Sequence, residues 1–321
     1  MTNTPPQKQA YATFCQSLSD CPIFAYPWFL DGVVPPDDWQ VALVEEKGRV
    51  IAALPYFRKK RWGFSYVTMP AFTKFMGPLL GRDHRSLPDQ HRLYQALIEQ
   101  LPPLAGFDQQ FSPGVTNWLA FRWAGYRQTT QYTYQIKLQE HPDWESRINR
   151  NMRRNIRKAD ALLRLRTDLD LTTFYKINQQ SFARQQLPIP YSFAQLQAHD
   201  KTLAQQQARQ LFFAEDEQGR IHSAAYLIWD QERAYYHLSG DDPDLRASGS
   251  GIWLIAQAIQ YTQEILQLPF FDFEGSMIPT VEAIRRQFGA EQLPYFRVWK
   301  INNPIYGALK WYSARMPIFT L

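Results

Sequence analysis

A glycine-rich loop in the second half of the chain has the residue types that bind phosphate groups. The loop has the pattern R-x-x-G-x-G over residues 246–251 and opens onto a segment with helical spacing of apolar residues. Glycines let backbone N–H groups approach a phosphate, a helix start supplies unpaired donors and a partial positive charge, and an arginine adds a cation. The loop therefore predicts a pyrophosphate site, with an ordinary connection as the alternative. Its residues are Arg246, Ser248, Gly249, Ser250 and Gly251.

Two carboxylates lie on a short apolar segment that we predict to be a strand. Asp272 and Glu274 alternate with phenylalanines in the segment 270–274, so on a strand both acids point to one face. Buried carboxylates are costly unless they bind something, and ligands collect at the carboxyl ends of strands. Either acid can take a proton from an amine, whereas pairing with arginines or capping the next helix is the structural alternative. His237, on a predicted strand beside the loop, is a third catalytic candidate, with a structural histidine as its alternative.

The positive charge of the chain is concentrated in one segment. Residues 145–166 hold eight basic and two acidic side chains, a surplus that exceeds the net charge of +5 of the whole chain. Apolar residues recur here every three or four positions, which predicts one helix with cations on its other faces. These cations form a solvated face, bind phosphates of tRNA or a nucleotide, or lie near anionic lipid. They are Arg150, Arg153, Arg154, Arg157 and Lys158.

The elements that must position these residues alternate between helices and strands, which indicates a mixed α/β class. The strand before the glycine-rich loop, the helix after it and the strand with the two acids follow one another closely. We predict helices at 143–163, 171–184, 192–207, 252–266 and 279–288, and strands at 209–215, 221–229, 233–238, 270–274 and 295–301.

The first part of the chain has the same mixed character. Apolar runs at 40–44 and 49–56, joined by a polar turn, predict a hairpin. Pro55 should end its second strand, since proline cannot donate to the ladder. We also predict a helix at 87–101 and a strand at 131–138.

The length of 321 residues predicts two domains. A polar stretch with a proline at 139–142 marks the expected boundary. We therefore expect an N-terminal domain over 1–139 and a C-terminal domain over 140–321. No phosphate-type loop occurs in the first, so a scaffold or acceptor-binding role is predicted for it.

Several classes of protein are disfavoured by what the chain lacks. No run of about 18 apolar residues occurs, and the first ten residues are polar, unlike a signal peptide. Cysteine and histidine spacings fit no metal site, so no metal is predicted. A cytoplasmic location is therefore expected, with peripheral association at the inner membrane face as an option.

The order of strand, R-x-x-G-x-G loop, helix, strand and helix resembles the acyl-CoA core of the GNAT acetyltransferases. More narrowly, the chain is similar to the FemAB-like branch, in which two GNAT-type domains lie in tandem. The resemblance implies two GNAT-like domains, each a mixed sheet flanked by helices. The matching segments are 153–159 (RRNIRKA), 271–276 (FDFEGS) and 285–290 (RRQFGA), with Leu54-Pro55-Tyr56, Gly77-Pro78 and Thr133-Tyr134 in the first half.

The resemblance implies an N-acyltransferase that moves an acyl group from acyl-CoA to an amine acceptor. In the GNAT pattern, amides near Gly249 and Gly251 would hold the CoA pyrophosphate, and amides near the end of strand 233–238 would polarise the thioester carbonyl. The tyrosine that many GNAT domains use as general acid has no counterpart in 279–288, and Tyr295 is a distant substitute.

Two alternatives remain from the same resemblance. FemAB-like enzymes use aminoacyl-tRNA to extend peptidoglycan precursors, so the cations of 150–158 would bind tRNA and the acceptor would be a lipid-linked cell-wall precursor. The long helical arm known from tRNA-dependent relatives is not visible, which favours acyl-CoA. The other alternative is a catalytically silent GNAT-like binding protein.

Overall fold

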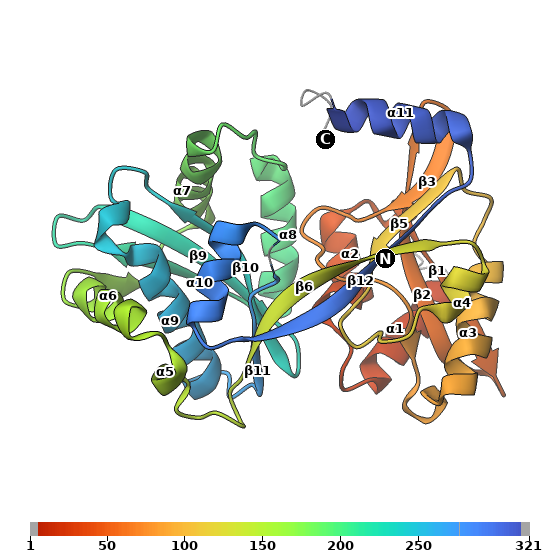
Figure 1. Cartoon of the computed structure of the whole chain (residues 1–321), viewed down its shortest axis with the longest axis horizontal. Coiled ribbons are helices and arrows are strands. Elements are labelled where there is room, and N and C mark those ends of the chain that lie inside the picture. Colours follow the sequence, from red (N-terminus) through yellow and green to blue (C-terminus); the bar gives the residue numbers. More distant parts are fainter. Residues whose placement is uncertain (1–5, 276, 316–321) are drawn as a thin grey trace. The chain divides into compact units, whose positions relative to one another are not determined.

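The computed structural model of the chain describes residues 6–275 and 277–315, with side chains up to 312 (Figure 1). Ser276, the last residue of one quoted motif, lies outside the described residues. The chain forms two units: unit 1 comprises residues up to 131 and from 294 onward, and unit 2 comprises 132–293. The predicted division cuts the chain once, at 139/140, whereas these units cut it twice. Each unit is described by itself.

Unit 1 is built on the predicted hairpin. Its strands β1 and β2 pair antiparallel, and the turn between them holds Lys47 and Gly48 at positive φ. The strand order is β1-β2-β3-β5-β12, with β4 beside β2. The strands are β1 (Trp39–Glu46), β2 (Arg49–Arg61), β3 (Phe64–Thr68), β4 (Leu79–Leu80), β5 (Gly106–Gln110) and β12 (Glu291–Ile301).

Strand β2 continues through Pro55, so its predicted end is wrong. Pro55 lies opposite Val41 of β1, and its carbonyl accepts a hydrogen bond of 2.9 Å from the Gln109 side chain. The nitrogen and carbonyl of one strand residue point to the same side, so the proline nitrogen also faces away from β1. The β1 ladder therefore loses no donor, and proline is tolerated.

The helices of unit 1 cover this sheet. Helix α3 begins where the Ser86 hydroxyl accepts the Asp89 N–H, and it buries Leu93, Tyr94 and Leu97. Its predicted start and type are confirmed. The helices are α1 (Pro6–Ser17), α2 (Pro27–Val33), α3 (Leu87–Glu99), α4 (Leu119–Trp123) and α11 (Pro304–Arg315), with 3₁₀ turns at Ile23–Ala25, Pro36–Asp38 and Arg82–His84.

Unit 2 has a mixed sheet in the order β6-β11-β10-β9-β8-β7. Strands β10 and β11 pair parallel, and the other neighbours pair antiparallel. The interleaved strands and helices confirm the predicted mixed α/β class. The strands are β6 (Arg127–Lys137), β7 (Arg164–Arg166), β8 (Arg209–Glu215), β9 (Ile221–Trp229), β10 (Arg233–Asp241) and β11 (Phe270–Asp272).

Helices cover both faces of this sheet. On one face Ala225 and Leu227 of β9 join a core with Trp253 of α9 and Met152 of α6. On the other face the ring of Tyr226 lies 5.6 Å from Phe174 of α7. The helices are α5 (Trp144–Arg147), α6 (Arg150–Asp160), α7 (Leu171–Arg184), α8 (Phe193–Gln205), α9 (Ser250–Glu264) and α10 (Pro279–Gln287), with a 3₁₀ turn, η4, at Arg246–Ser248.

The predicted helix over 143–163 is two helices, α5 and α6. Ile148 is extended, and the Asn149 side chain caps α6 by accepting the Asn151 N–H at 2.9 Å. The Asn149 N–H itself donates to the carbonyl of Gln287. The chain breaks here because asparagine competes for backbone hydrogen bonds. The apolar stripe from Trp144 to Leu163 nevertheless lies in the core, as predicted.

Candidate functional site

The glycine-rich loop opens directly onto α9, as the sequence predicts. Gly249 follows the 3₁₀ turn η4, and its φ of +78° is the left-handed conformation that favours glycine. Helix α9 begins at Ser250. A Cβ built on Gly249 would lie 3.8 Å from the backbone oxygen of Asn155, so helix α6 packs beside the start of α9.

A cavity of about 570 Å³ adjoins this helix start. The end of β10, the loop with the first turns of α9, and α10 form its walls, together with the end of α7. Arg184, Arg246 and Arg285 line it, whereas Asp241 is the one carboxylate among the described residues of its lining. The excess of cations suits an anionic ligand. Four of the five predicted loop residues line the cavity, namely Arg246, Gly249, Ser250 and Gly251.

Ser248 is turned away from this cavity. Its hydroxyl donates to the Leu245 carbonyl at 2.8 Å and lies 2.9 Å from Nδ1 of His222. Nε2 of His222 lies 2.9 Å from the Asp216 carboxylate. Because His222 is buried on β9, these contacts fasten the loop to the sheet.

Strands β10 and β11 separate beside the cavity. They pair only from Arg233 to Tyr235, whereas β10 continues next to β9 as far as Asp241. A β-bulge on β10 at His237 shifts the register with β9. Bulges re-aim side chains and often lie near active sites. Past the bulge, the Asp241 N–H donates to the Ser181 hydroxyl at 2.7 Å. This amide therefore already has an acceptor within the protein.

The carboxylate of Asp241 lies against the start of α9. A Cβ built on Gly251 would lie 2.7 Å from Oδ1 of Asp241, and Nε of Arg246 lies 3.5 Å from Oδ2. Burial raises the pKa of Asp241 above that of an ordinary carboxyl, and the charge of Arg246 partly opposes this rise. Sequence reasoning missed Asp241, although only residues 242–245 separate it from the glycine-rich loop.

Asp272 and Glu274 do not share one strand face, which corrects the prediction. Strand β11 ends at Asp272, and the chain then turns through Glu274 at φ +56° and Gly275 at φ +68°. Asp272 is fully buried, and its Oδ1 accepts the Thr133 hydroxyl at 2.6 Å and the Glu274 N–H at 2.7 Å. Burial raises the pKa of Asp272, and Arg233 opposes this effect. Asp272 therefore holds the turn that orients Glu274.

Glu274 instead points to the bulge residue of β10. Its Oε1 lies 2.6 Å from Nδ1 of His237, whose Nε2 lies 3.2 Å from Nε2 of His199 on α8. Burial lowers the pKa of His199 well below that of an ordinary histidine, and His237 adds to this effect. His199 is therefore neutral at pH 7. The sequence offered no signal for His199, which lies 38 residues from its partner.

The three predicted catalytic residues form a network that does not line the cavity. Asp272 is fully buried, and the side chains of His237 and Glu274 are 2% and 13% exposed. Arg285 of α10 connects the two features. It lines the cavity, and its guanidinium lies 5.0 Å from the ring centre of Phe273 and 5.6 Å from that of Tyr236. Burial lowers the pKa of Arg285, while Tyr236, Glu274 and Asp272 oppose this shift. Among the described residues, its Nε has no hydrogen-bond partner.

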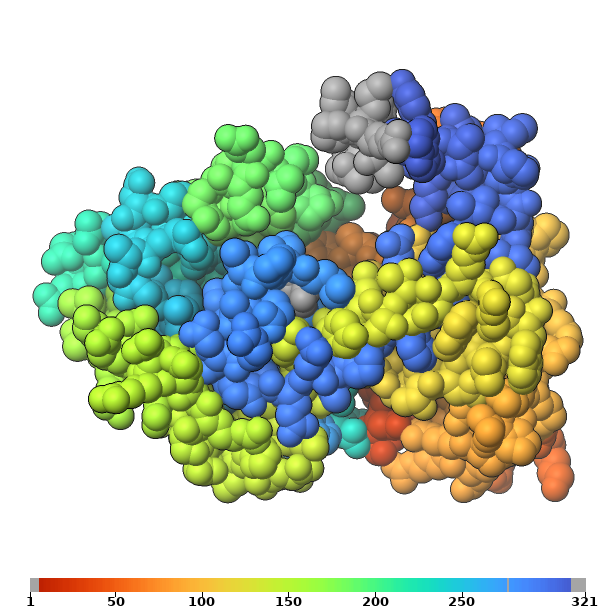
Figure 2. All heavy atoms as spheres, viewed as in Figure 1, coloured from red at the N-terminus to blue at the C-terminus, as the bar shows by residue number. Residues whose placement is uncertain are grey.

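Helix α6, yellow-green in Figure 2, lies at the surface of unit 2. Within the described part of the chain, the side chains of its cations form no ion pair. Arg153 and Arg157 also line a smaller hollow between α6 and α9, of about 230 Å³. Arg150, Arg154, Arg157 and Lys158 are exposed, and Arg153 is half-buried.

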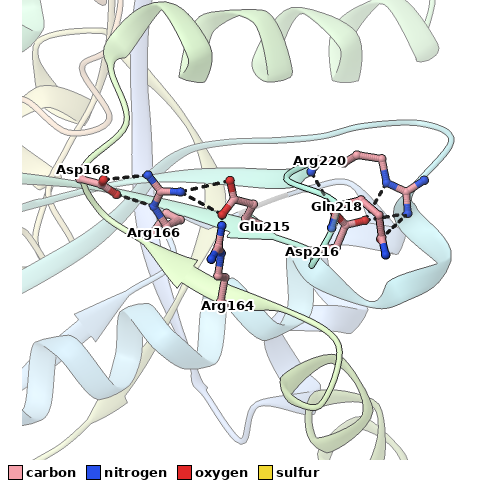
Figure 3. A network of polar contacts seen from close by, with 7 residues as sticks. All are labelled: Arg164, Arg166, Asp168, Glu215, Asp216, Gln218 and Arg220. Carbon is pink, nitrogen blue, oxygen red and sulfur yellow. Dashed lines mark hydrogen bonds and ion pairs between the residues drawn. The ribbon is translucent and has the colours of Figure 1, made fainter.

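Two other arginines of the basic segment behave differently (Figure 3). Nε of Arg164 lies 2.5 Å from Oε2 of Glu215, and Nη1 of Arg166 lies 2.9 Å from the same atom. Arg166 also pairs with Asp168 at 2.7 Å. Internal carboxylates therefore compensate these charges, in contrast to those of α6.

Comparison with known proteins agrees with this architecture. Residues 146–278 match the family profile described as an acetyltransferase (GNAT) domain. No curated protein matches the chain significantly. Among solved structures, FemX is similar with a TM-score of 0.71 and 12% identity, over 94% of this chain and 98% of that one.

Two further solved structures share the fold. L-PGS from Bacillus licheniformis is similar with a TM-score of 0.56 and 11% identity, over 95% of each chain. A tandem GNAT protein from the clavulanic acid biosynthesis pathway has a TM-score of 0.54 and 11% identity, over 91% of this chain and 92% of that one.

The class that these findings define is the tandem GNAT fold, which confirms the predicted fold class. Residues 146–278 match a GNAT acetyltransferase domain, and the chain shares its fold with FemX. No helix among the described residues has the length and apolar character needed to cross a bilayer.

Proposed function

We propose that the protein is an N-acyltransferase that moves an acyl group from acyl-CoA to an amine. The observation that supports this most is the cavity at the start of α9, where Arg184, Arg246 and Arg285 surround a glycine-rich helix start. Guanidinium groups and helix N-terminal amides both bind phosphates. The fit has one opposing charge, the carboxylate of Asp241, which Arg246 partly neutralises.

The buried network supplies the proton acceptor in this proposal. Acyl-CoA presents a thioester carbonyl, and an amine that attacks it forms the C–N bond as the C–S bond breaks. Glu274 takes the proton that the amine loses and becomes uncharged, and His237, whose Nδ1 lies 2.6 Å from Oε1 of Glu274, can accept this proton in turn. Asp272 orients Glu274 by accepting a hydrogen bond from the backbone N–H of Glu274.

Tyr236 is the candidate proton donor for the departing thiolate. It lines the cavity on β10, directly before the bulge at His237. Burial raises the pKa of Tyr236, and the nearby Arg285 opposes this rise. A phenol that keeps its proton at pH 7 can act as a general acid. Tyr236 therefore replaces the tyrosine missing from α10.

Calorimetric titration with CoA tests the proposed donor. We expect Arg246→Glu to weaken CoA binding by about tenfold or more, because charge-assisted hydrogen bonds contribute ~1.5–3 kcal/mol. Arg92→Glu on α3 is the matched control, since Arg92 is exposed and forms its ion pairs with Glu46 and Asp89, far in sequence from the cavity lining. Wild-type protein that binds no CoA at millimolar concentration would refute the proposed donor.

A second candidate is FemAB-like transfer from aminoacyl-tRNA onto a peptidoglycan precursor. The observation that favours it is the set of uncompensated cations on α6, which packs beside the glycine-rich loop. Phosphates of a tRNA end are suitable partners for such a helix. Both donors are made in the cytoplasm, where the proposed reaction takes place, and a lipid-linked acceptor would bring it to the inner membrane face.

A further inference from the structure

Helix α11 of unit 1 presents an apolar stripe to solvent. Ile305, Trp311 and Tyr312 are 65%, 57% and 56% exposed, and Ala308 is exposed between them. These positions recur every three to four residues, so they lie on one face of the helix. Exposed apolar side chains grouped in this way mark an interaction surface rather than scattered surface residues.

The opposite face of α11 is fastened to unit 1. Tyr306 is buried, with its ring 6.0 Å from Phe64 and 5.1 Å from Tyr66 of β3. Nζ of Lys310 lies 2.8 Å from the carboxylate of Asp108 on β5. Figure 1 shows α11 across the end of β3. Because Tyr306 and Lys310 attach one face of α11 to unit 1, the face with the apolar stripe points outward.

A run of cations lies on the neighbouring strand. Arg58-Lys59-Lys60-Arg61 ends β2, and Trp62 follows with 46% exposure. The four cations line a second cavity, of about 510 Å³, together with Tyr66 and two acids, Asp37 and Asp38. Among the described residues, these cations form no ion pair. Tyr66, which lines this cavity, and Phe64, which pairs with Arg61, both contact Tyr306 of α11, so the cation run and helix α11 lie side by side.

We propose that this surface docks on a bilayer that contains anionic phospholipid. Its components are Ile305, Ala308, Trp311 and Tyr312 of α11 with the β2 segment 58–62, and we name it the α11 surface. Tryptophan and tyrosine favour the boundary between headgroups and acyl chains. Basic residues add attraction to anionic lipid, and the cations outnumber the two nearby acids. A peripheral helix of this kind lies in the plane of the interface.

Charge and hydrophobicity together favour a bilayer over a protein partner. A protein that covered the stripe would need an acidic surface directly beside an apolar one. An anionic bilayer offers both along its whole extent, without a specific shape. The proposal goes beyond the acyl-transfer reaction, because it concerns unit 1 alone and requires no donor.

Flotation of the full chain with vesicles tests the proposal. We expect binding to vesicles of phosphatidylglycerol mixed with phosphatidylcholine, and much weaker binding to phosphatidylcholine alone. Ile305→Ser combined with Trp311→Ser should lower the partition coefficient by about tenfold or more. Lys59→Glu combined with Lys60→Glu should lower it by a similar factor at low salt and by less at high salt.

The matched control is Trp123→Ser on α4 of the same unit. Trp123 is 63% exposed and lies outside the α11 surface, so we expect unchanged vesicle binding. Circular dichroism and thermal melts establish that each variant folds. Wild-type protein that does not float with anionic vesicles overturns the proposal. So does a Trp311→Ser variant that floats like the wild type but changes from dimer to monomer, because the stripe would then join two copies of the chain.

Discussion

Asp241 is the residue whose charge most affects the candidate donor site. Its carboxylate faces the start of α9, where a phosphate would bind under the proposed function. Arg246 contacts this carboxylate and would also contact the bound phosphate. Burial raises the pKa of Asp241. The protonated form is therefore favoured to a higher pH than for an ordinary carboxyl. A protonated Asp241 repels no phosphate, which makes donor binding sensitive to pH.

We predict that Asp241→Asn strengthens CoA binding by about three- to tenfold at neutral pH, because one like charge next to the phosphates is removed. Wild-type affinity should also rise as the pH falls through the pKa of Asp241, since protonation removes the same charge. Calorimetric titration of both proteins across this pH range measures the effect. An Asp241→Asn variant with the affinity and pH profile of the wild type would contradict it.

The cations of helix α6 act as a group, because together they form a surface that can bind a polyanion. The cations of α6 have no carboxylate partner among the described residues, whereas Arg164 and Arg166 share Glu215 on the neighbouring strand (Figure 3). The two groups are close in sequence and equal in charge type. Only the first group is free to neutralise an external polyanion.

We predict that Arg154→Gln and Arg157→Gln each weaken tRNA binding and each lower the slope of log Kd against log salt by about one, as expected for lost phosphate contacts. Arg164→Gln is the matched control, because Glu215 already compensates its charge. Filter binding at several salt concentrations measures all three. Equal effects of the three variants would mean that net charge, not α6, attracts the tRNA.

Each unit of the whole molecule has its own core, and unit 1 takes its last strand from the far end of the chain. Strand β12 pairs with β5, with Val298 opposite Gln109, and Val298 is fully buried in the core of unit 1. Helix α11 follows this strand and carries the proposed membrane surface. The fold of unit 1 therefore depends on residues that lie far apart in the sequence.

We predict that a chain ending at residue 293 loses the cooperative unfolding of unit 1, because β5 then lacks its partner β12. Val298→Ala should lower the free energy of unfolding of the complete chain by about 2 kcal/mol through the cavity it leaves. Ile265→Ala is the control, since Ile265 is 65% exposed and should change this free energy by less than about 0.5 kcal/mol. Urea unfolding followed by circular dichroism compares them, and a truncated chain as stable as the complete one would contradict the prediction.

Local patterns determined much of the fold and part of the site. The loop over 246–251 opens onto a helix because Gly249 can adopt positive φ, and that property belongs to the residue itself. The hairpin β1–β2 and the helix α3 follow from turn residues, caps and apolar spacing within a few positions. The FemAB-like motifs likewise predicted the tandem GNAT fold.

Only the tertiary structure decided which charged groups meet. Glu274 contacts His237 because the chain turns left-handed after β11 and because β10 bulges, and neither event follows from strand periodicity. Asp241 faces Gly251 because β10 ends beside α9. Residue types and short spacings determine local conformation, whereas contacts between distant residues depend on how whole elements pack.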